Sequence, residues 1–236
     1  MSMKKDPRKE VLALWKLRSK AEKKARQGGN KDLGLRAGVT SGRHLDPLSQ
    51  LVRDVFVDAG IPPENVHCGT RNLEIPGFYR PQKKWDVVVV HDGVLVAAVE
   101  FKSILGSYGN NMNNRTEESL GNAADLLEAA EQGLIGTRPP WLGFVFFMQD
   151  DDKSRGGGKS LKQPHFPVDG AFVGATYQQR ASIWLRRLLM KRLYNAAWYA
   201  VVNPKLGVNG VHEPDAELSW AKFEAAIRGR VGEVLA

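Results

Sequence analysis

Apolar residues recur along the chain at two spacings, one typical of helices and the other of strands. Residues 6–27 carry a short apolar stripe surrounded by lysines, which predicts a basic helix. A second run of apolar residues with helical spacing begins at Pro47, directly after the expected N-cap Asp46, and ends before Gly60. The first quarter of the chain is therefore predicted to be helical, with an irregular link between its two helices.

Two runs rich in β-branched residues follow, over residues 85–90 and 94–101. His91-Asp92-Gly93 between them is a hairpin signal. The same patterns then predict, in chain order, a helix, a strand, a helix, a strand and a helix over residues 116–132, 142–148, 177–197, 198–203 and 215–228. This interleaving predicts an α/β fold with one mixed central sheet flanked by helices. The Asp- and Gly-rich residues 150–158 predict a flexible loop.

The composition is that of an ordinary globular chain of 236 residues, with 42% hydrophobic and 25% charged residues. No apolar run approaches the roughly 20 residues that span a bilayer, and the charged start lacks the apolar stretch of a signal peptide. Cys68 is the single cysteine, so it cannot form an intrachain disulfide and is expected to serve packing. We therefore expect a cytoplasmic protein without a membrane partner.

Positive charge is concentrated near the N-terminus. The formal net charge is +8, and residues 1–53 carry 14 Lys and Arg against 5 Asp and Glu. Such a segment attracts polyanions, among which DNA, RNA and anionic lipid stay open on charge alone. We expect a basic helical N-terminal arm over residues 1–44 and one main domain over residues 45–236.

Three common kinds of site lack support in the sequence. The Gly-rich residues 156–160 lack the earlier glycine of a phosphate loop, because Lys153 stands there, and Pro164 interrupts the helix that should follow. The five histidines form no i, i+4 pair and have no neighbouring cysteine, so a zinc site is not predicted. A Gly-x-Ser-x-Gly nucleophile motif does not occur in the sequence.

Three charged side chains stand at the ends of the predicted hairpin strands. Asp86 opens the first strand, and Glu100 and Lys102 close the second. Residues two apart on a strand point to the same face, so Glu100 and Lys102 are expected side by side. Burying these charges is costly unless they pair with each other or meet a metal. Asp86 and Glu100 together offer the hard oxygen ligands that Mg²⁺ prefers, whereas a plain salt bridge is the alternative.

The spacing of Asp86, Glu100 and Lys102 resembles that of the PD-(D/E)-x-K nuclease superfamily, with Trp85 in place of the proline. Longer segments resemble the XhoI-type restriction endonuclease family. They are Leu73 to Pro81, Lys84 to Asp86, Ala97 to Ser103, Gly109 to Glu118 with Gly121, Ala123 and Asp125, Pro139 to Gly143, Pro164 to Phe166, and Arg192 to Tyr194. The likeness covers most of residues 45–203.

This resemblance implies a type II restriction endonuclease with a restriction-endonuclease-like core. It implies a Mg²⁺-dependent homodimer that cuts double-stranded DNA at the palindrome CTCGAG, after the first C, and a cognate methyltransferase in the same restriction-modification system. Asp86 and Glu100 are implied metal ligands, and Lys102 is implied to orient or activate the attacking water. Such a site suits phosphodiester hydrolysis, which needs positive charge where an anion forms.

Further candidates surround these three residues. Glu117 and Glu118 either cap the helix that follows the asparagine-rich segment or add an acid facing the metal, with Glu118 as the candidate ligand. The side chains expected to contact DNA are Asn110, Asn111, Asn113, Asn114, Arg115, Arg80, Lys83 and Lys84. Asparagine and arginine can read base edges, but a turn-rich loop without DNA contacts is the alternative for the asparagines. Arg180, Arg187 and Lys191 share one face of a predicted helix, either solvated or in contact with phosphate.

Two other functions stay open. The first is a DNA-binding or regulatory protein of the same fold that does not cleave, and the second is a repair or structure-specific nuclease. The intact Asp86, Glu100 and Lys102 favour cleavage over the first, and the asparagine-rich segment favours the restriction family over the second.

The hairpin register decides whether Asp86 and Glu100 can share a metal. A plain two-residue turn at Asp92-Gly93 sets Asp86 opposite Val99 and faces it away from Glu100. A shared site therefore requires a three-residue loop or a bulge between Asp86 and Glu100, and we predict that irregularity.

Overall fold

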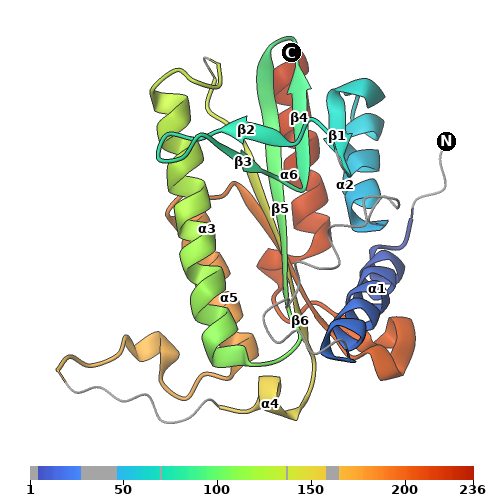
Figure 1. Ribbon diagram of the computed structural model, residues 1–236, viewed down its shortest axis with the longest axis vertical. Helices are drawn as coiled ribbons and strands as arrows, with labels where there is room; N and C mark the ends of the chain where they lie inside the picture. The colour runs from blue at the N-terminus through green and yellow to red at the C-terminus, as the bar shows by residue number, and fades with distance from the viewer. Residues whose placement is uncertain (1–4, 28–46, 70, 137, 158–164) are drawn as a thin grey trace.

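A six-stranded mixed sheet forms the centre of the molecule (Figure 1). The computed structural model describes residues 5–27, 47–69, 71–136, 138–157 and 165–236, with the side chains of the first helix described as far as Leu17. The strand order is β1-β4-β5-β6-β7-β8, in which β5, β6 and β7 are parallel and the other neighbours antiparallel. The strands are Val66–Cys68 (β1), Val87–His91 (β4), Val94–Ile104 (β5), Leu142–Gln149 (β6), Ala196–Val202 (β7) and Val211–His212 (β8). The predicted mixed sheet flanked by helices is confirmed.

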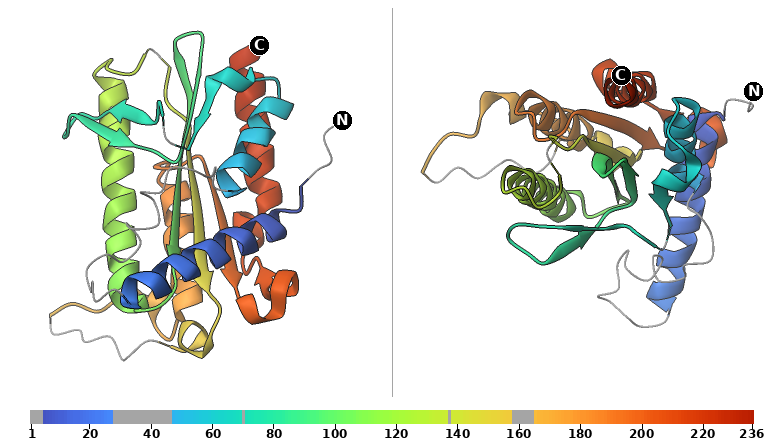
Figure 2. Two further views of the ribbon diagram at one scale, coloured as in Figure 1. Left: turned by 45° about the vertical axis from the view of Figure 1, so that its right-hand side comes forward. Right: turned by 90° about the horizontal axis from the view of Figure 1, so that it is seen from above.

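Helices cover both faces of this sheet (Figure 2). One layer contains α1 (Pro7–Gln27), α2 (Pro47–Asp58) and α6 (Trp220–Leu235), and the other contains α3 (Tyr108–Glu131) and α5 (Tyr177–Met190). The short helices are α4 (Asp152–Arg155) and the 3-10 turns η1 (Pro63–Asn65), η2 (Gly170–Phe172), η3 (Pro204–Gly210) and η4 (Ala216–Leu218). Along β5, Val99 and Phe101 pack in the α2 and α6 layer, whereas Ala98 and Ile104 pack in the α3 and α5 layer. Because strand residues alternate, Glu100 and Lys102 are presented toward α3.

The basic helix α1 packs against the domain. Its residues Val11, Leu12, Leu14 and Trp15 are buried in the same apolar cluster as α2 and α6, and the partly buried Cys68 packs against that cluster as expected. The predicted link and the boundary near residue 44 lie outside the described residues, so the division into arm and main domain stays a prediction. Within the described ranges, no helix is long and apolar enough to cross a membrane.

Helix α3 begins at Tyr108, eight residues before the predicted start at residue 116. The prediction of a loop over the asparagine-rich segment is therefore wrong. Tyr108 and Met112 are buried one turn apart, and their packing holds the first turns against the sheet. This tertiary packing outweighs the low helix propensity of glycine and asparagine.

Among the other differences from the prediction are one helix boundary and one loop. Helix α5 ends at Met190, not at residue 197, because Arg192 adopts a left-handed conformation with φ +55° and the chain then enters β7. The predicted flexible loop over residues 150–158 contains the short helix α4, whose N-cap Asp151 accepts a hydrogen bond from the Ser154 amide at 2.8 Å. Both differences arise from local capping contacts that hydrophobic periodicity does not report.

The β4–β5 hairpin carries the predicted irregularity. Asp92 and Gly93 form a two-residue turn with φ of +48° and +73°, and the register then shifts by one residue at a bulge on β5 that contains Val96. Asp86 directly precedes β4. Its amide donates to the carbonyl oxygen of Val99 at 3.1 Å, and its carboxylate accepts from the amide of Phe101 at 2.6 Å. Asp86 therefore contacts the backbone on both sides of Glu100.

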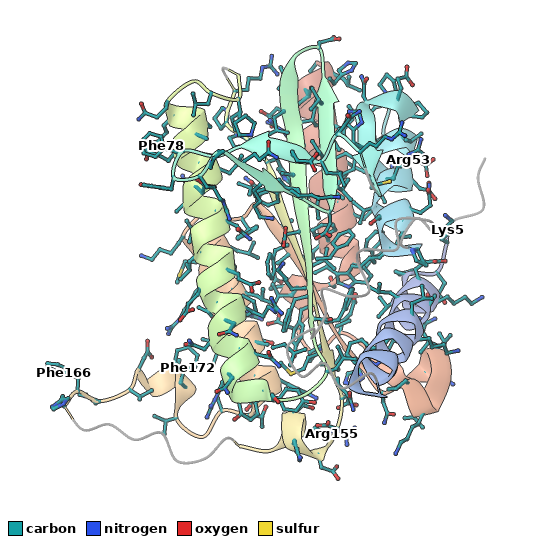
Figure 3. The ribbon with its side chains drawn as sticks, viewed as in Figure 1. Lys5, Arg53, Phe78, Arg155, Phe166 and Phe172 are labelled. Atoms are coloured by element: carbon teal, nitrogen blue, oxygen red, sulfur yellow. The ribbon has the colours of Figure 1, made fainter. Side chains whose placement is uncertain are left out.

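A separate hairpin of β2 (Glu74–Pro76) and β3 (Gln82–Lys84) crosses the α3 layer (Figure 1). Its tip, labelled at Phe78 in Figure 3, is held by the buried carboxylate of Asp125 on α3. The amides of Phe78 and Tyr79 donate to Oδ1 of Asp125 at 2.9 and 2.8 Å, and Nε of Arg80 donates to Oδ2 at 2.6 Å. A Cβ atom at Gly77 would lie 2.5 Å from the same Oδ2, so only glycine lets the tip approach α3 this closely.

We predict that Gly93→Ala lowers the free energy of unfolding by about 1–2 kcal/mol, because an alanine at φ +73° is strained. No atom lies within 4 Å of a Cβ atom built at Gly93, so the loss of stability would come from backbone strain and not from a steric clash. The matched control is Gly106→Ala, which is equally open but lacks a positive φ, and denaturant titration should find it nearly neutral. Equal losses in the two variants would contradict the prediction.

We predict that Asp125→Asn costs about 2–3 kcal/mol of stability, because three donors lose a charged acceptor. Burial raises the pKa of the Asp125 carboxyl, but the Tyr79 amide and the Arg80 guanidinium outweigh it, so the pKa lies below its usual value. This stabilisation is present above the unfolded pKa of about 3.9 and is lost as the pH falls through the lower folded pKa. The difference between wild type and variant should therefore shrink in acid, whereas the exposed control Glu131→Gln should show little difference at any pH.

Candidate active site

Glu100 is the centre of the candidate site. Its side chain is only 4% exposed, yet two ammonium groups reach it. Nζ of Lys83 lies 2.6 Å from Oε2, and Nζ of Lys102 contacts Oε1. Burial raises the pKa of the Glu100 carboxyl, but the charges of Lys83 and Lys102 outweigh it and hold the pKa below its usual value. Glu100 is therefore an ionised carboxylate inside the protein.

The structure brings Asp86, Glu100 and Lys102 together. Lys102 follows Glu100 on the same face of β5, and Asp86 contacts the backbone on both sides of Glu100. The Glu100–Lys102 ion pair that the sequence offers as an alternative is formed. That pair alone does not explain the second lysine on Glu100.

Helix α3 adds one carboxylate to this group. Oε2 of Glu118 lies 3.6 Å from Nζ of Lys102, and the same oxygen contacts the guanidinium of Arg115. Glu117 instead accepts a hydrogen bond from Asn113 at 2.7 Å on the exposed surface of the helix. Since α3 begins at Tyr108, neither glutamate lies in its first turn, so the interpretation of plain capping is wrong.

Lys83 is the member of the site that the sequence did not reveal. It was expected among the DNA contacts, but its side chain is only 11% exposed and lies against Glu100, with Nζ 4.3 Å from the centre of the Trp85 ring. Strand β3 has three residues, too few to show a periodic pattern, and its place over β5 depends on the hairpin tip bound to α3. No signal in the sequence distinguishes Lys83 from its exposed neighbour Lys84.

The other predicted DNA contacts are spread along α3 and the β2–β3 hairpin. Asn110, Asn113 and Asn114 are exposed, and Asn111 donates to the carbonyl oxygen of Gly106 at 2.6 Å. Arg80 also contacts the side chain of Asn122, at 2.8 Å, in addition to its bond to Asp125. Their contacts with DNA stay predictions.

Of the three basic residues predicted to share one helix face, Arg180 and Arg187 make internal contacts, whereas Lys191 is exposed just beyond the end of α5. Nε of Arg180 donates to the carbonyl oxygen of Ala175 at 3.0 Å, and Arg187 forms an ion pair with Asp169 at 2.7 Å. Arg187 also lies over the ring of Phe172, 4.9 Å from its centre. These contacts favour a structural role for both arginines.

The donor chemistry of the site fits Mg²⁺. Asp86 and Glu100 supply hard carboxylate oxygens, and Mg²⁺ is commonly held by one or two carboxylates with waters and substrate phosphate at the other positions. In the part of the chain that the structure describes, no three His, Cys, Asp or Glu side chains form a ready ligand set. A metal here would therefore depend on these two carboxylates and on groups brought by solvent and substrate.

Comparison with known proteins supports one family. A sequence model described as "Restriction endonuclease XhoI" matches residues 23–212. The chain is 40% identical over 187 residues to the type II restriction enzyme XhoI of Xanthomonas vasicola, covering 77% of this chain and 73% of that protein. It is 34% identical over 206 residues to BstVI of Geobacillus stearothermophilus (84% and 91%) and 38% identical over 161 residues to AbrI of Azospirillum brasilense (67% and 72%), both also named type II restriction enzymes.

No solved structure matches the chain. The family match nevertheless spans the β2–β3 hairpin, the β4–β5 hairpin and α3, which together supply every member of the candidate site. The mixed sheet with helices on both faces is consistent with a restriction-endonuclease-like fold. The chain therefore belongs to the XhoI restriction endonuclease family and is an endonuclease.

Proposed function

We propose that the protein is a Mg²⁺-dependent type II restriction endonuclease that cuts double-stranded DNA at CTCGAG, after the first C. We further propose that it acts as a homodimer in the cytoplasm, beside a cognate methyltransferase of the same restriction-modification system. The observation that carries the proposal is the Glu100–Lys102 ion pair, with Asp86 bonded to the backbone on both sides of Glu100, within the segment that matches the family.

Each residue of the candidate site has its own role in the proposed phosphodiester hydrolysis. Asp86 and Glu100 would hold Mg²⁺, which when bound supplies positive charge to the phosphate oxygens on which negative charge develops. Glu100 is kept ionised, as a metal ligand must be. Lys102 orients the attacking water and adds a fixed positive charge beside it. Glu118 holds the Lys102 ammonium from the α3 side, and it is a candidate for a further ligand.

DNA binding is proposed for the surface around this site. Asn110 and Asn114 are exposed on α3, the helix that carries Glu118. Amide side chains of this kind can bind adenine edges or phosphate. The basic N-terminal residues add attraction for the phosphate backbone that does not depend on sequence.

The test is incubation of purified protein with a plasmid that carries one CTCGAG site, with and without Mg²⁺, followed by sequencing of the ends. We expect one cut per site, after the first C on each strand, and none with EDTA. Asp86→Asn, Glu100→Gln and Lys102→Met should each slow cleavage by roughly 10²–10⁴-fold while duplex binding persists.

Glu131→Gln, an exposed change at the far end of α3, is the matched control and should cut at the wild-type rate. Uncut plasmid with tight binding by the wild-type protein would contradict the proposal and favour a DNA-binding protein without cleavage. Cleavage at branched or damaged DNA but not at CTCGAG would favour a repair enzyme.

We predict that two copies bind one palindromic duplex, because a two-fold symmetric sequence is read by two symmetric copies of one surface. Sedimentation of the protein with a CTCGAG duplex should give a complex of two chains per duplex. A complex of one chain per duplex at all working concentrations would count against the homodimer.

A further inference from the structure

We infer that Lys83 is a positioning residue that occupies Oε2 of Glu100 in the metal-free enzyme and leaves it when metal and DNA bind. Metal binding and DNA binding are thereby linked through one side chain. The inference rests on the proposed Mg²⁺-dependent cleavage, because it concerns the carboxylate that would hold the metal.

The contacts of Glu100 leave neither carboxylate oxygen unoccupied. Lys83 contacts Oε2 at 2.6 Å, and Lys102 contacts Oε1. Although a carboxylate oxygen has two lone pairs, a metal ion and an ammonium group on the same oxygen repel each other, since both are cations. Withdrawal of one of the two lysines therefore favours coordination of a metal by Glu100.

Moving Lys83 away from Glu100 costs less free energy than moving Lys102. Lys102 is carried by β5 itself, and its ammonium also lies 3.6 Å from the Glu118 carboxylate. Lys83 comes from the separate two-stranded sheet, and its ammonium also contacts the carbonyl oxygen of Lys84 at 3.0 Å and the Trp85 ring. Lys102 thus keeps a carboxylate partner without Glu100, whereas Lys83, among the described residues, pairs with the Glu100 carboxylate alone.

The charges of the site explain how DNA would assist this exchange. The carboxylates of Asp86, Glu100 and Glu118 balance three cations, those of Lys83, Lys102 and Arg115. A divalent metal alone would make this set strongly positive. A phosphodiester adds negative charge and offers the Lys83 ammonium a new partner next to the metal, so each ligand should favour the binding of the other.

The experiment is a titration of Mn²⁺ at pH 8, followed by the electron paramagnetic resonance signal of the free ion, on the full chain without DNA. Neutral variants Lys83→Met and Lys83→Gln should bind Mn²⁺ on the order of tenfold more tightly than wild type, because the competing cation is gone. Lys83→Arg keeps the charge and should bind as wild type does. Lys84→Met, an exposed neighbour on the same strand, is the matched control and should also bind as wild type does.

A second titration uses the protein bound to a CTCGAG duplex with a non-hydrolysable linkage at the cut position. DNA should tighten Mn²⁺ binding in the wild type and do so much less in Lys83→Met. Circular dichroism identifies any variant that fails to fold. If either Lys83→Met or Lys83→Gln does not fold, the other neutral variant is used.

Several results would overturn the inference. It fails if the folded neutral variants bind Mn²⁺ no more tightly than wild type, if Lys84→Met shows the same gain, or if Lys83→Arg gains as much as Lys83→Met. The titration without DNA does not depend on the recognition sequence, so it decides the role of Lys83 even if plasmid cleavage shows that the proposed specificity is wrong.

Discussion

The ion pairs around the buried Glu100 carboxylate are the constraint on which the rest of the site depends. An isolated carboxylate inside a sheet costs several kcal/mol in lost hydration, and removal of one partner from a buried ion pair leaves that cost uncompensated. Here Lys102 lies on the same strand, but Lys83 must be delivered from elsewhere in the chain. The small β2–β3 hairpin does so, and its position is set by the bonds of its tip to Asp125 on α3. The buried charge of Glu100 therefore depends on three elements, which are strand β5, the β2–β3 hairpin and helix α3.

The β4–β5 pairing places the second carboxylate. The bulge containing Val96 changes the register of the two strands, and β4 begins at Val87, directly after Asp86. Among the described strands, β6 alone continues to pair with β5 from Glu100 onward. The carboxylate of Asp86 accepts from the Phe101 amide, a backbone donor on the side of β5 that β4 no longer covers. The end of one strand thus both satisfies that donor and brings a carboxylate beside Glu100.

Helix α3 connects the candidate active site with the surface proposed to bind DNA. Its buried residues Tyr108 and Met112 pack on the sheet, its Glu118 reaches Lys102, and its Asp125 holds the hairpin. The exposed Asn110 and Asn114 project from the same helix. Because one helix carries all of these groups, a shift of α3 on DNA binding would change the surroundings of both lysines. It would move Glu118 relative to Lys102, and Asp125 would move the hairpin that carries Lys83. The same architecture explains why a helix rich in asparagine is stable here: tertiary packing supplies what its propensity lacks.

The sequence by itself determined the mixed α/β sheet, both hairpin strands, the identity of Asp86, Glu100 and Lys102 as neighbours, and the need for either a bulge or a three-residue loop between Asp86 and Glu100. These features follow from short-range hydrophobic periodicity and from residue spacing along adjacent strands, and both can be read from the sequence alone. Only the tertiary structure decided that the asparagine-rich segment is helical, that Glu118 and not Glu117 reaches the site, and that Lys83 lies on Glu100 while Lys84 does not. Each of these depends on contacts between residues far apart in the chain, such as the hairpin tip with Asp125, 46 positions after Tyr79. Such contacts are set by the packing of whole elements, and no local pattern of residues encodes them.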